Sequence, residues 1–229
     1  MARKTAPTGN IQRRTYLKEK NSMQPDLNDK NMNVESMAKK ALKDEGILSE
    51  LIDNLTTKNE TVRYNCSKTL NLLSEEHPEV LYPKWDFFVG LLNSDHTYWK
   101  LSVIPLLANL ARTDTEKKFE EIFEKFFRLL NDKSMIPAAW VADNSGRIAR
   151  AKPELETRIT DKLLNIDKTH HSPERRDLIK AGAIESFDQY FEEAKDQKRI
   201  LEFVKRQLNS KSPKTVKKAT EFLKKRGIE

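Results

Sequence analysis

The chain has one cysteine, few glycines and no long apolar run, and each shortage excludes a class of protein. Cys66 alone can form no internal disulfide and no cysteine metal site, which fits a reducing cytoplasm. The longest apolar stretch, residues 101–111, has 11 residues, whereas a membrane-spanning helix needs about 20. No apolar segment follows the basic start of the chain, so we expect no secretory signal. These absences predict a cytoplasmic protein that makes no membrane contact.

Signals for strands and hairpins are also scarce. Only six of the 229 residues are glycine, and almost no segment alternates apolar and polar residues. Charged residues make up 34% of the chain and apolar residues 37%, a balance that fits an elongated stack of helices with most residues near water. We therefore expect an all-α fold.

The net charge of +7 is concentrated at the two ends of the chain. Residues 1–30 carry a net +4 and residues 195–229 a net +8, which leaves −5 for the middle. A basic domain often indicates nucleic-acid binding, but an excess confined to the ends weakens that inference. Residues 1–30 contain few large apolar residues and are interpreted as a flexible basic tail. Residues 31–229 are interpreted as one domain of helical repeats.

A repeated pattern runs through that domain. Five segments end in leucine followed by a polar residue, with leucines at positions 55, 92, 130, 164 and 208, a spacing of 34 to 44 residues. A second helix follows each turn, with an apolar residue early and a small residue three or four positions later. The early apolar residues are Val62, Tyr98, Met135, Leu178 and Val216, and the small residues are Cys66, Ser102, Ala139, Gly182 and Ala219. A two-helix repeat of about 40 residues is typical of a solenoid, in which small residues let neighbouring helices approach closely.

The pattern predicts about five helix pairs, after a short helix that begins near Asn33. The expected pairs are 46–56 with 59–75, 79–92 with 96–112, 115–131 with 134–150, 153–165 with 173–194, and 196–209 with 213–226. Thr115 and Ser172 are predicted N-caps, and Pro153 and Pro173 fit the first turn of a helix. Gly227 is expected just beyond the end of the last helix.

Residues 58–70 and 212–223 share one pattern, in which a polar turn is followed by valine and a basic residue, then small residues and a leucine. This pattern resembles the second half of a HEAT repeat, of the armadillo-like α-solenoid family, and the resemblance covers about residues 46–226. It implies a right-handed α-α superhelix whose second helices line a concave surface. Trp99 and Ile136 replace the basic residue in the second and third units, and Pro105 and Pro137 are expected to interrupt their helices.

No pattern of catalytic or metal-binding residues is present. His77, His96, His170 and His171 are interpreted as polar loop residues, because none belongs to the His-Glu pairs with which HEAT-like iron hydroxylases bind iron. There is no nucleophile motif and no glycine-rich phosphate loop. Cys66 occupies the small-residue position of its helix and is expected in the core. We therefore expect no cofactor and no metal, and favour a protein that is not an enzyme.

The most suggestive constellation lies in the second helix of the third unit. Trp140, Asp143, Asn144, Arg147 and Arg150 fall at spacings of three and four and so share one helical face. Some alkylpurine DNA glycosylases are HEAT-like and use Trp, Asp and Arg on the concave surface, a resemblance of fold and residue type that assigns no catalytic residue here. The simpler interpretation is an i,i+4 ion pair between Asp143 and Arg147 beside a packing tryptophan.

The aromatic residues mostly fall at core spacing. Phe119, Phe123 and Phe126 form a helical stripe that predicts packing between repeats. Tyr98 and Trp99 are adjacent and cannot both point inward, so one is expected to be exposed as a possible anchor for a partner.

The last helix has a basic side, formed by Lys214, Lys217, Lys218 and Lys225. It fits either the solvated face of a capping repeat or a phosphate-binding stripe.

Two functions remain open. The favoured hypothesis is a non-catalytic scaffold that binds another protein with the concave face of the solenoid. Its predicted contact residues are Arg63, Trp99, Lys100, Trp140, Asp143, Arg147, Lys180 and Lys217. The alternative is a nucleic-acid-binding or DNA-repair protein of HEAT-like fold, which rests on the sequence pI of 9.3, the basic last helix and the cluster around Asp143.

Overall fold

A computed structural model describes residues 27–228, and every regular element in that range is a helix. The all-α prediction is therefore confirmed for the described residues. No helix among them is long and apolar enough to cross a membrane. The chain divides into two compact units, residues 1–72 and residues 73–229, which are described separately below.

The first unit contains α2 (Val34–Ala41), α3 (Glu45–Asp53), the 3-10 helix η1 (Asn54–Thr56) and most of α4 (Glu60–Glu76). Asn33 and Asp44 cap α2 and α3, because their side-chain oxygens accept hydrogen bonds from backbone amides of the first turn. Cys66 lies in the core of this unit, as predicted, and burial raises the pKa of its thiol to about 12.

Residues 27–30, the last four of the predicted tail, are the only ones of it that the structure describes. Leu27 is fully buried, and the side-chain amide of Asn65 donates hydrogen bonds of 2.8 Å to the carbonyl oxygens of Leu27 and Asp29. Residues 27–30 are thus packed against α4, because one apolar side chain and one amide suffice to hold them there. The prediction of a flexible tail over residues 1–26 lies outside the described residues.

The second unit begins within α4 and continues as helix pairs. Its elements are α5 (Pro78–Leu81), η2 (Tyr82–Lys84), α6 (Trp85–Leu91), α7 (Thr97–Leu110), α8 (Lys118–Phe127), η3 (Arg128–Asn131), α9 (Met135–Ala151), η4 (Pro153–Leu155), α10 (Glu156–Leu164), η5 (Ile166–Lys168), α11 (Pro173–Tyr190), η6 (Phe191–Glu193), α12 (Gln197–Arg206), η7 (Gln207–Asn209) and α13 (Pro213–Lys225). Each agrees with the predicted pairs to within a few residues, once the 3-10 turns are joined to their α-helices.

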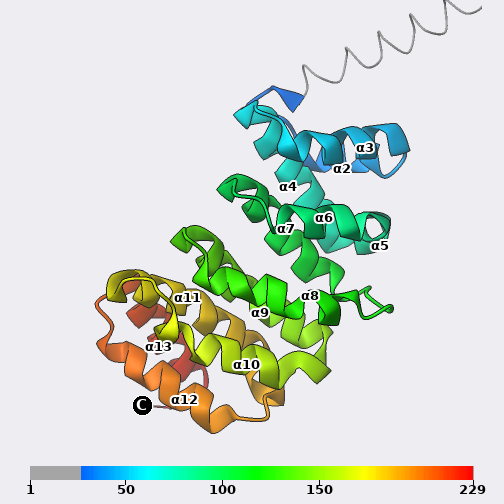
Figure 1. The fold of residues 1–229 in the computed structure, drawn as a ribbon. Helices are drawn as coiled ribbons and strands as arrows, with labels where there is room; N and C mark the ends of the chain where they lie inside the picture. The colour runs from blue at the N-terminus through cyan, green and yellow to red at the C-terminus, as the bar shows by residue number, and fades with distance from the viewer. Residues whose placement is uncertain (1–26, 229) are drawn as a thin grey trace, which may run out of the picture. The chain divides into compact units, whose positions relative to one another are not determined.

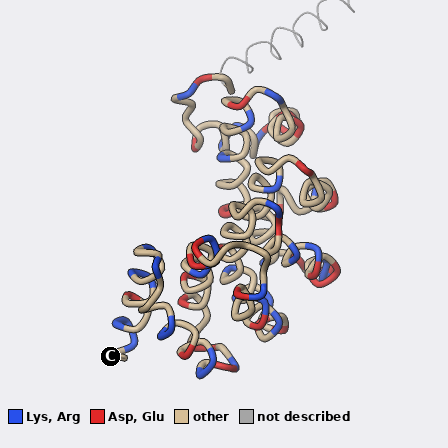
Figure 2. The backbone as a smooth tube through the Cα atoms, turned by 60° about the vertical axis from the view of Figure 1, so that its left-hand side comes forward, with Lys and Arg blue, Asp and Glu red and all other residues tan. Residues whose placement is uncertain are grey.

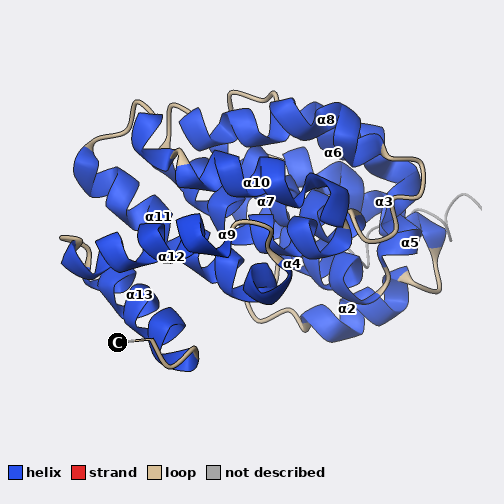
Figure 3. Cartoon of the chain, turned by 90° about the horizontal axis from the view of Figure 1, so that it is seen from below, coloured by secondary structure: helices blue, strands red, loops and turns tan. Residues whose placement is uncertain are grey.

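Helices α7, α9, α11 and α13 pack side by side in that order (Figures 1 and 3). We call this group the second-helix layer. Each member also contacts the element before it in its pair, so that α6 packs on α7, η3 on α9, α10 on α11 and α12 on α13. The predicted phenylalanine stripe of α8 is fully buried at Phe119, Phe123 and Phe126, and it supplies much of the apolar packing in the middle of the unit.

The backbones of α9 and α11 approach each other unusually closely. A Cβ added to Gly146 would lie 2.7 Å from the carbonyl oxygen of Ser186, and one added to Gly182 would lie 2.9 Å from the backbone nitrogen of Asp143. Ser186 Oγ accepts a hydrogen bond from the amide of Gly146 (2.8 Å) and donates one to the carbonyl oxygen of Ala142 (2.5 Å). The predicted role of the small residue at position 182 is therefore confirmed.

Asp114 connects three elements of the second unit. Its carboxylate accepts hydrogen bonds from the backbone amides of Lys118 and Phe119, both at 2.9 Å, and so caps α8. The hydroxyl of Tyr82 donates to it (2.6 Å), and the buried ammonium of Lys152 lies 3.0 Å from it. These hydrogen bonds hold the pKa of Asp114 below its ordinary value despite its burial, which alone would raise it.

Two local predictions were wrong. Thr115 does not cap α8, because the chain makes a further turn in which Lys117 takes a positive φ of 60°, and this brings Asp114 to the helix terminus. Pro105 and Pro137 do not interrupt their helices. Helix α7 runs through Pro105, and Pro137 falls in the first turn of α9, where the amide that proline lacks has no helical partner. Gly227 has a φ of 63° just beyond α13, as predicted.

The close contact between α9 and α11 predicts opposite effects for two glycine substitutions. Gly146→Ala should destabilise the protein by about 1 to 3 kcal/mol, because its methyl group would overlap backbone that cannot move freely. Gly90→Ala, in α6, should instead stabilise it by about 0.5 to 1 kcal/mol, since nothing lies within 4 Å and alanine favours a helix. Urea denaturation measures the free energy of unfolding of both variants. Equal changes in the two would contradict the close contact between α9 and α11 at Gly146.

Asp114→Asn should cost about 3 kcal/mol at neutral pH, because it leaves the ammonium of Lys152 buried without its counter-charge. Because the pKa of Asp114 is lowered, its ionised form stabilises the fold at pH values above 3.8, the ordinary pKa. This stabilisation is lost as the pH falls below that value and Asp114 becomes protonated, so the difference in stability between the variant and wild type should shrink in acid. The control is Glu116→Gln, an exposed partner of Lys118, which should change stability by less than about 0.5 kcal/mol. Urea denaturation at several pH values distinguishes the two.

Candidate partner-binding surface

Three of the eight predicted contact residues are buried and hold the fold together. Arg63, in the first unit, donates a hydrogen bond of 2.8 Å to the carbonyl oxygen of Thr57. Lys100 lies 2.5 Å from Asp132. The third residue, Lys180, lies 2.7 Å from Asp167 and 3.4 Å from Asp177.

These cations were expected to face a partner, but each connects its helix to a neighbouring turn instead. Helical spacing alone did not reveal this, because Thr57, Asp132 and Asp167 lie outside the helices that carry the three cations.

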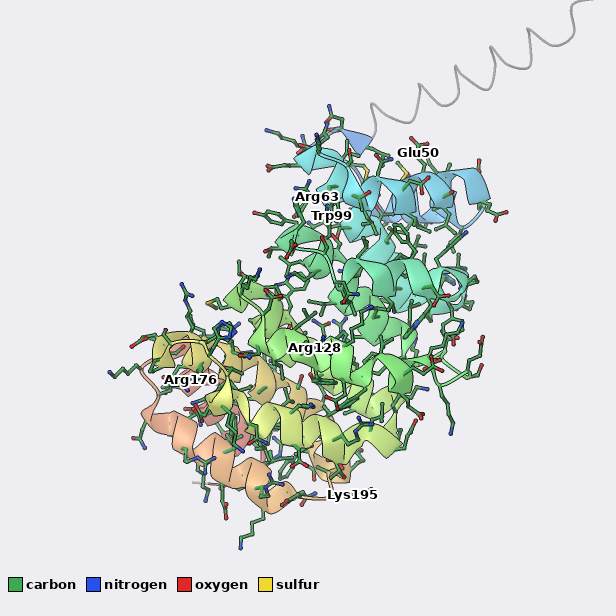
Figure 4. All side chains as sticks on the ribbon, viewed as in Figure 1. Glu50, Arg63, Trp99, Arg128, Arg176 and Lys195 are labelled. Atoms are coloured by element: carbon green, nitrogen blue, oxygen red, sulfur yellow. The ribbon has the colours of Figure 1, made fainter. Side chains whose placement is uncertain are left out.

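Two further predicted contact residues are reached by solvent, since Trp99 is half-buried and Lys217 is exposed. The indole of Trp99 is half-buried at the start of α7 and stacks on the imidazole of His96, with ring centroids 5.1 Å apart (Figure 4). Its neighbour Tyr98 is 59% exposed, which confirms that one of this pair faces solvent. Lys217 projects from α13, with its ammonium 3.9 Å from the carboxylate of Glu221.

The exposed face of α9 carries Trp140, Asp143, Arg147 and Arg150, as the helical spacing predicted. Asn144 does not belong to it. Its side chain is buried and donates a hydrogen bond back to the carbonyl oxygen of Trp140.

The expected ion pair between Asp143 and Arg147 is also not formed. The guanidinium of Arg147 lies 3.2 Å from Glu75 Oε1 and 3.0 Å from Asn109 Oδ1, and so connects α9 to α4 and α7. Asn109 and Glu75 are 38 and 72 residues away from Arg147 in sequence. The spacing of residues along one helix cannot predict contacts at such separations.

Asp143 instead pairs with Glu185 of α11. Solvent still reaches Asp143, but the protein atoms around its carboxyl remove part of its hydration, and the carboxylate of Glu185 accepts a hydrogen bond from it. Together these effects raise the pKa of Asp143 from its ordinary value of 3.8 to about 6. The pKa of Glu185 is lowered, since Asp143 and Lys218 both hydrogen-bond to its charged form. As the pH falls through about 6 the pair therefore takes up its first proton, which Asp143 holds in a hydrogen bond to Glu185.

Inter-helix hydrogen bonds fix which residues of the second-helix layer lie level with one another. Arg147 and Asn109 join α9 to α7 at an offset of 38 residues, and Thr215 and the carbonyl of Asp177 join α13 to α11 at the same offset. Ser186 joins α11 to α9 at offsets of 40 and 44. These helices therefore run parallel, and residues separated by such offsets lie side by side.

This register aligns four apolar residues, one on each helix. Tyr98, Ile136, Leu178 and Val216 are separated by 38, 42 and 38 residues and form what we call the apolar row. The exposed fractions of the first three are 59%, 47% and 41%, while Val216 is half-buried. Trp140, which is 39% exposed, lies one turn further along α9.

The apolar row was partly visible in the sequence. Three of its members are the early apolar residues of the repeat pattern, but that periodicity did not show which side of the helix they face. In the third unit the exposed residue is Ile136, and Met135 is half-buried. The corresponding residue Val62 belongs to the first unit and is half-buried there.

Several cations of α13 form ion pairs with α11. Lys218 pairs with Glu185, and Lys225 and Arg226 both pair with Asp188 of α11, at 3.0 and 2.7 Å. Figure 2 shows the basic positions that recur along this last helix. Much of the stripe therefore connects α13 to α11.

All four histidines lie in loops, as predicted, although one of them is buried. His171 is buried, and the pKa of its imidazole is lowered by desolvation and by the neighbouring His170. Its loop folds against the end of η3, where Asn131 Oδ1 accepts a hydrogen bond of 2.8 Å from the backbone amide of His170. Among residues 27–228, no group of three His, Cys, Asp or Glu side chains could hold a metal ion.

Comparison with known proteins gives one structural likeness. No protein-family model matches the chain, and no curated protein matches its sequence. The crystal structure of an engineered protein, a target of the Northeast Structural Genomics Consortium, is similar over 87% of this chain and 93% of that one, with a TM-score of 0.53 and 18% identity. At that identity the likeness concerns the fold alone.

The shared proton of Asp143 and Glu185 is directly measurable. Carbon-detected NMR of carboxyl-labelled protein should show an Asp carboxyl that titrates near pH 6, and Asp143→Asn should remove this titration. Glu185→Gln should move the midpoint of Asp143 downward but not to its ordinary value, because partial desolvation, the larger cause, remains. A midpoint near 3.8 in wild type would show that the two carboxyls are not coupled.

Proposed function

We propose that this protein is a non-catalytic scaffold of HEAT-like, right-handed superhelical type, which binds another protein with the exposed face of its second-helix layer. Consecutive helix pairs stack so that α7, α9, α11 and α13 lie side by side, which supports the repeat interpretation. The proposed surface is the apolar row together with Trp140, Asp143 and Arg147.

The apolar row is the observation that supports this function. Isolated apolar side chains are common on protein surfaces, but large ones aligned on adjacent helices form a continuous strip, which is typical of an interaction site. Tyrosine and tryptophan are frequent anchors in protein interfaces, because they bury much area while losing little side-chain entropy. Tyr98 and Trp140 hold such positions here.

Nucleic-acid binding or DNA repair is the alternative, and the geometry supports it less well. Lys218, Lys225 and Arg226 are engaged with carboxylates of α11, and a phosphate backbone would have to compete with these pairs. The apolar row would also stay uncovered by phosphates. Asp143 is the candidate acid for a repair reaction, so Asp143→Asn would abolish base excision if that alternative held.

Two leucines with the same exposed fraction provide a matched test of the scaffold. Leu178 in the apolar row and Leu208 in η7 are both 41% exposed. Leu178→Ser should reduce capture of a protein partner about tenfold, which corresponds to about 1.4 kcal/mol of lost contact, whereas Leu208→Ser should leave capture unchanged. The measurement is quantitative mass spectrometry of proteins bound to the tagged chain from its own cell lysate, after nuclease treatment.

Thermal denaturation of both variants controls for folding, and their midpoints should differ by no more than a few degrees. Equal losses for the two leucines would remove the apolar row as the binding surface. Partners that vanish with nuclease, or nucleic acid recovered alone, would favour the alternative function.

A further inference from the structure

The loop that joins η5 to α11 buries an imidazole without hydrogen-bond partners. His171 is 3% exposed, and within residues 27–228 neither nitrogen of its ring has a hydrogen-bond partner. A neutral imidazole carries one donor and one acceptor, so burying both unpaired costs stability. A protonated ring would carry two donors and a full charge in the same place, at a much larger cost. We call residues 169–172 the His171 loop.

Burial, a second imidazole and a guanidinium all oppose a charge on this ring. Desolvation is the largest cause that lowers the pKa of His171. The imidazole of His170 lies against it, with ring centroids 4.3 Å apart, and Arg175 in the first turn of α11 adds a positive charge nearby. Arg175 repels a protonated His171 at every pH, and His170 does so once it is protonated itself.

Two groups at the end of η3 favour the charged form of His171, the carbonyl of Leu130 and the carboxylate of Asp132. They do not outweigh desolvation. The carbonyl has no net charge, and the carboxylate is already 2.5 Å from the ammonium of Lys100. A protonated His171 is therefore more stable in solvent than against η3.

Helix η5 is attached to α11 independently of the loop between them. The carboxylate of Asp167 lies 2.7 Å from the ammonium of Lys180, and the backbone carbonyl of Asp167 accepts a hydrogen bond from Arg176 (Figure 4). Ile166 of η5 is also fully buried. Movement can therefore be confined to the four residues of the His171 loop.

The His171 loop contacts η3 and borders a groove. Asn131 Oδ1 accepts the hydrogen bond of 2.8 Å from the amide of His170 and lies 2.7 Å from Nδ1 of its ring. Thr169 and Leu130 line a groove of about 520 Å³, which lies between α8 and α10. The groove leaves room beside the loop when it moves away from η3.

We propose that the His171 loop is an acid-sensitive contact between the third and fourth helix pairs. At neutral pH the neutral ring of His171 is buried against η3 and the loop is closed. Protonation brings the ring into solvent, breaks the contact of His170 with Asn131 and opens the loop, while α8 to α13 keep their packing. The device needs no partner, so it goes beyond the proposed binding function and does not rest on it.

The direction of the pH effect follows from the lowered pKa of His171. The open loop binds the proton more readily than the closed one, so closure is favoured above the ordinary value of 6.5 and weakens as the pH falls below it. One such group changes the ratio of open to closed loop by about tenfold between pH 7.0 and 5.5. The raised pKa of Asp143 acts in the opposite direction, since the folded state favours its protonated form.

Hydrogen exchange of single amides, followed by NMR and corrected for the intrinsic effect of pH, tests the loop in the full chain. In wild type, protection of the His170 amide should fall about tenfold between pH 7.0 and 5.5, because its bond to Asn131 breaks when the loop opens. The amides of α8 and α9 should keep their protection.

His171→Leu is the decisive variant, because leucine fills the buried site and cannot be protonated. The protection of the His170 amide should then stay constant over this pH range. His171→Phe carries the same expectation and replaces it if the leucine variant does not fold. The control is His96→Leu, which removes an exposed imidazole at the start of α7 and should leave the acid response as in wild type.

Three results would overturn the inference. Constant protection of His170 in wild type would show that the loop stays closed in acid. An equal fall in wild type and in the variants at position 171 would assign the response to another group. An equal fall at His170 and at the amides of α8 and α9 would show that acid unfolds the whole unit and not this loop.

Discussion

Helices α9 and α11 come together at Gly146 and Gly182, where the two backbones leave no room even for a methyl group. Ser186 fixes this contact, because its hydroxyl bonds both the amide of Gly146 and the carbonyl oxygen of Ala142, two groups that lie one helical turn apart. A contact between backbones cannot slide, since any shift would bring a larger residue into the same space. The register of the second-helix layer is fixed by this constraint.

The exposed surface of the layer follows from that register. Ile136 and Leu178 lie level because the glycine contact places them so, and the polar links of Arg147 to Asn109 and of Thr215 to Asp177 extend the alignment to α7 and α13. The same alignment brings Asp143 beside Glu185, and this proximity adds to the effect of desolvation, the larger cause, in raising the pKa of Asp143. A shift of one turn along α11 would separate the carboxyls and break the apolar row.

Local signals in the sequence predicted the helices well. Pro173 at the start of α11, Gly227 after α13 and the phenylalanine stripe of α8 act within a few residues of chain, where composition and period are sufficient. The failure at Thr115 has a cause that is not local. Asp114 is an equally good cap, and the choice between the two depends on Tyr82 and Lys152, which are distant in sequence.

The candidate site was harder to predict, because its chemistry depends on pairs of helices. Spacing along α9 grouped Asp143 with Arg147, but each finds its partner on another helix, Glu185 in one case and Glu75 in the other. Lys100 and Lys180 look like surface cations on their own helices until the acidic residues of adjacent turns are placed beside them.

Ion pairing between helices explains which charges stay available at the surface. Where the layer is closed by a neighbouring turn or helix, a cation is drawn into a pair that contributes to packing, as for Lys180 and Arg226. Beside the apolar row Arg175 and Lys214 are exposed, and the charge of Lys214 acts on Asp143 and Glu185 without a close ion pair. The fold thus leaves large apolar side chains exposed together at one place, in the apolar row, and this is the surface on which the proposed binding function rests.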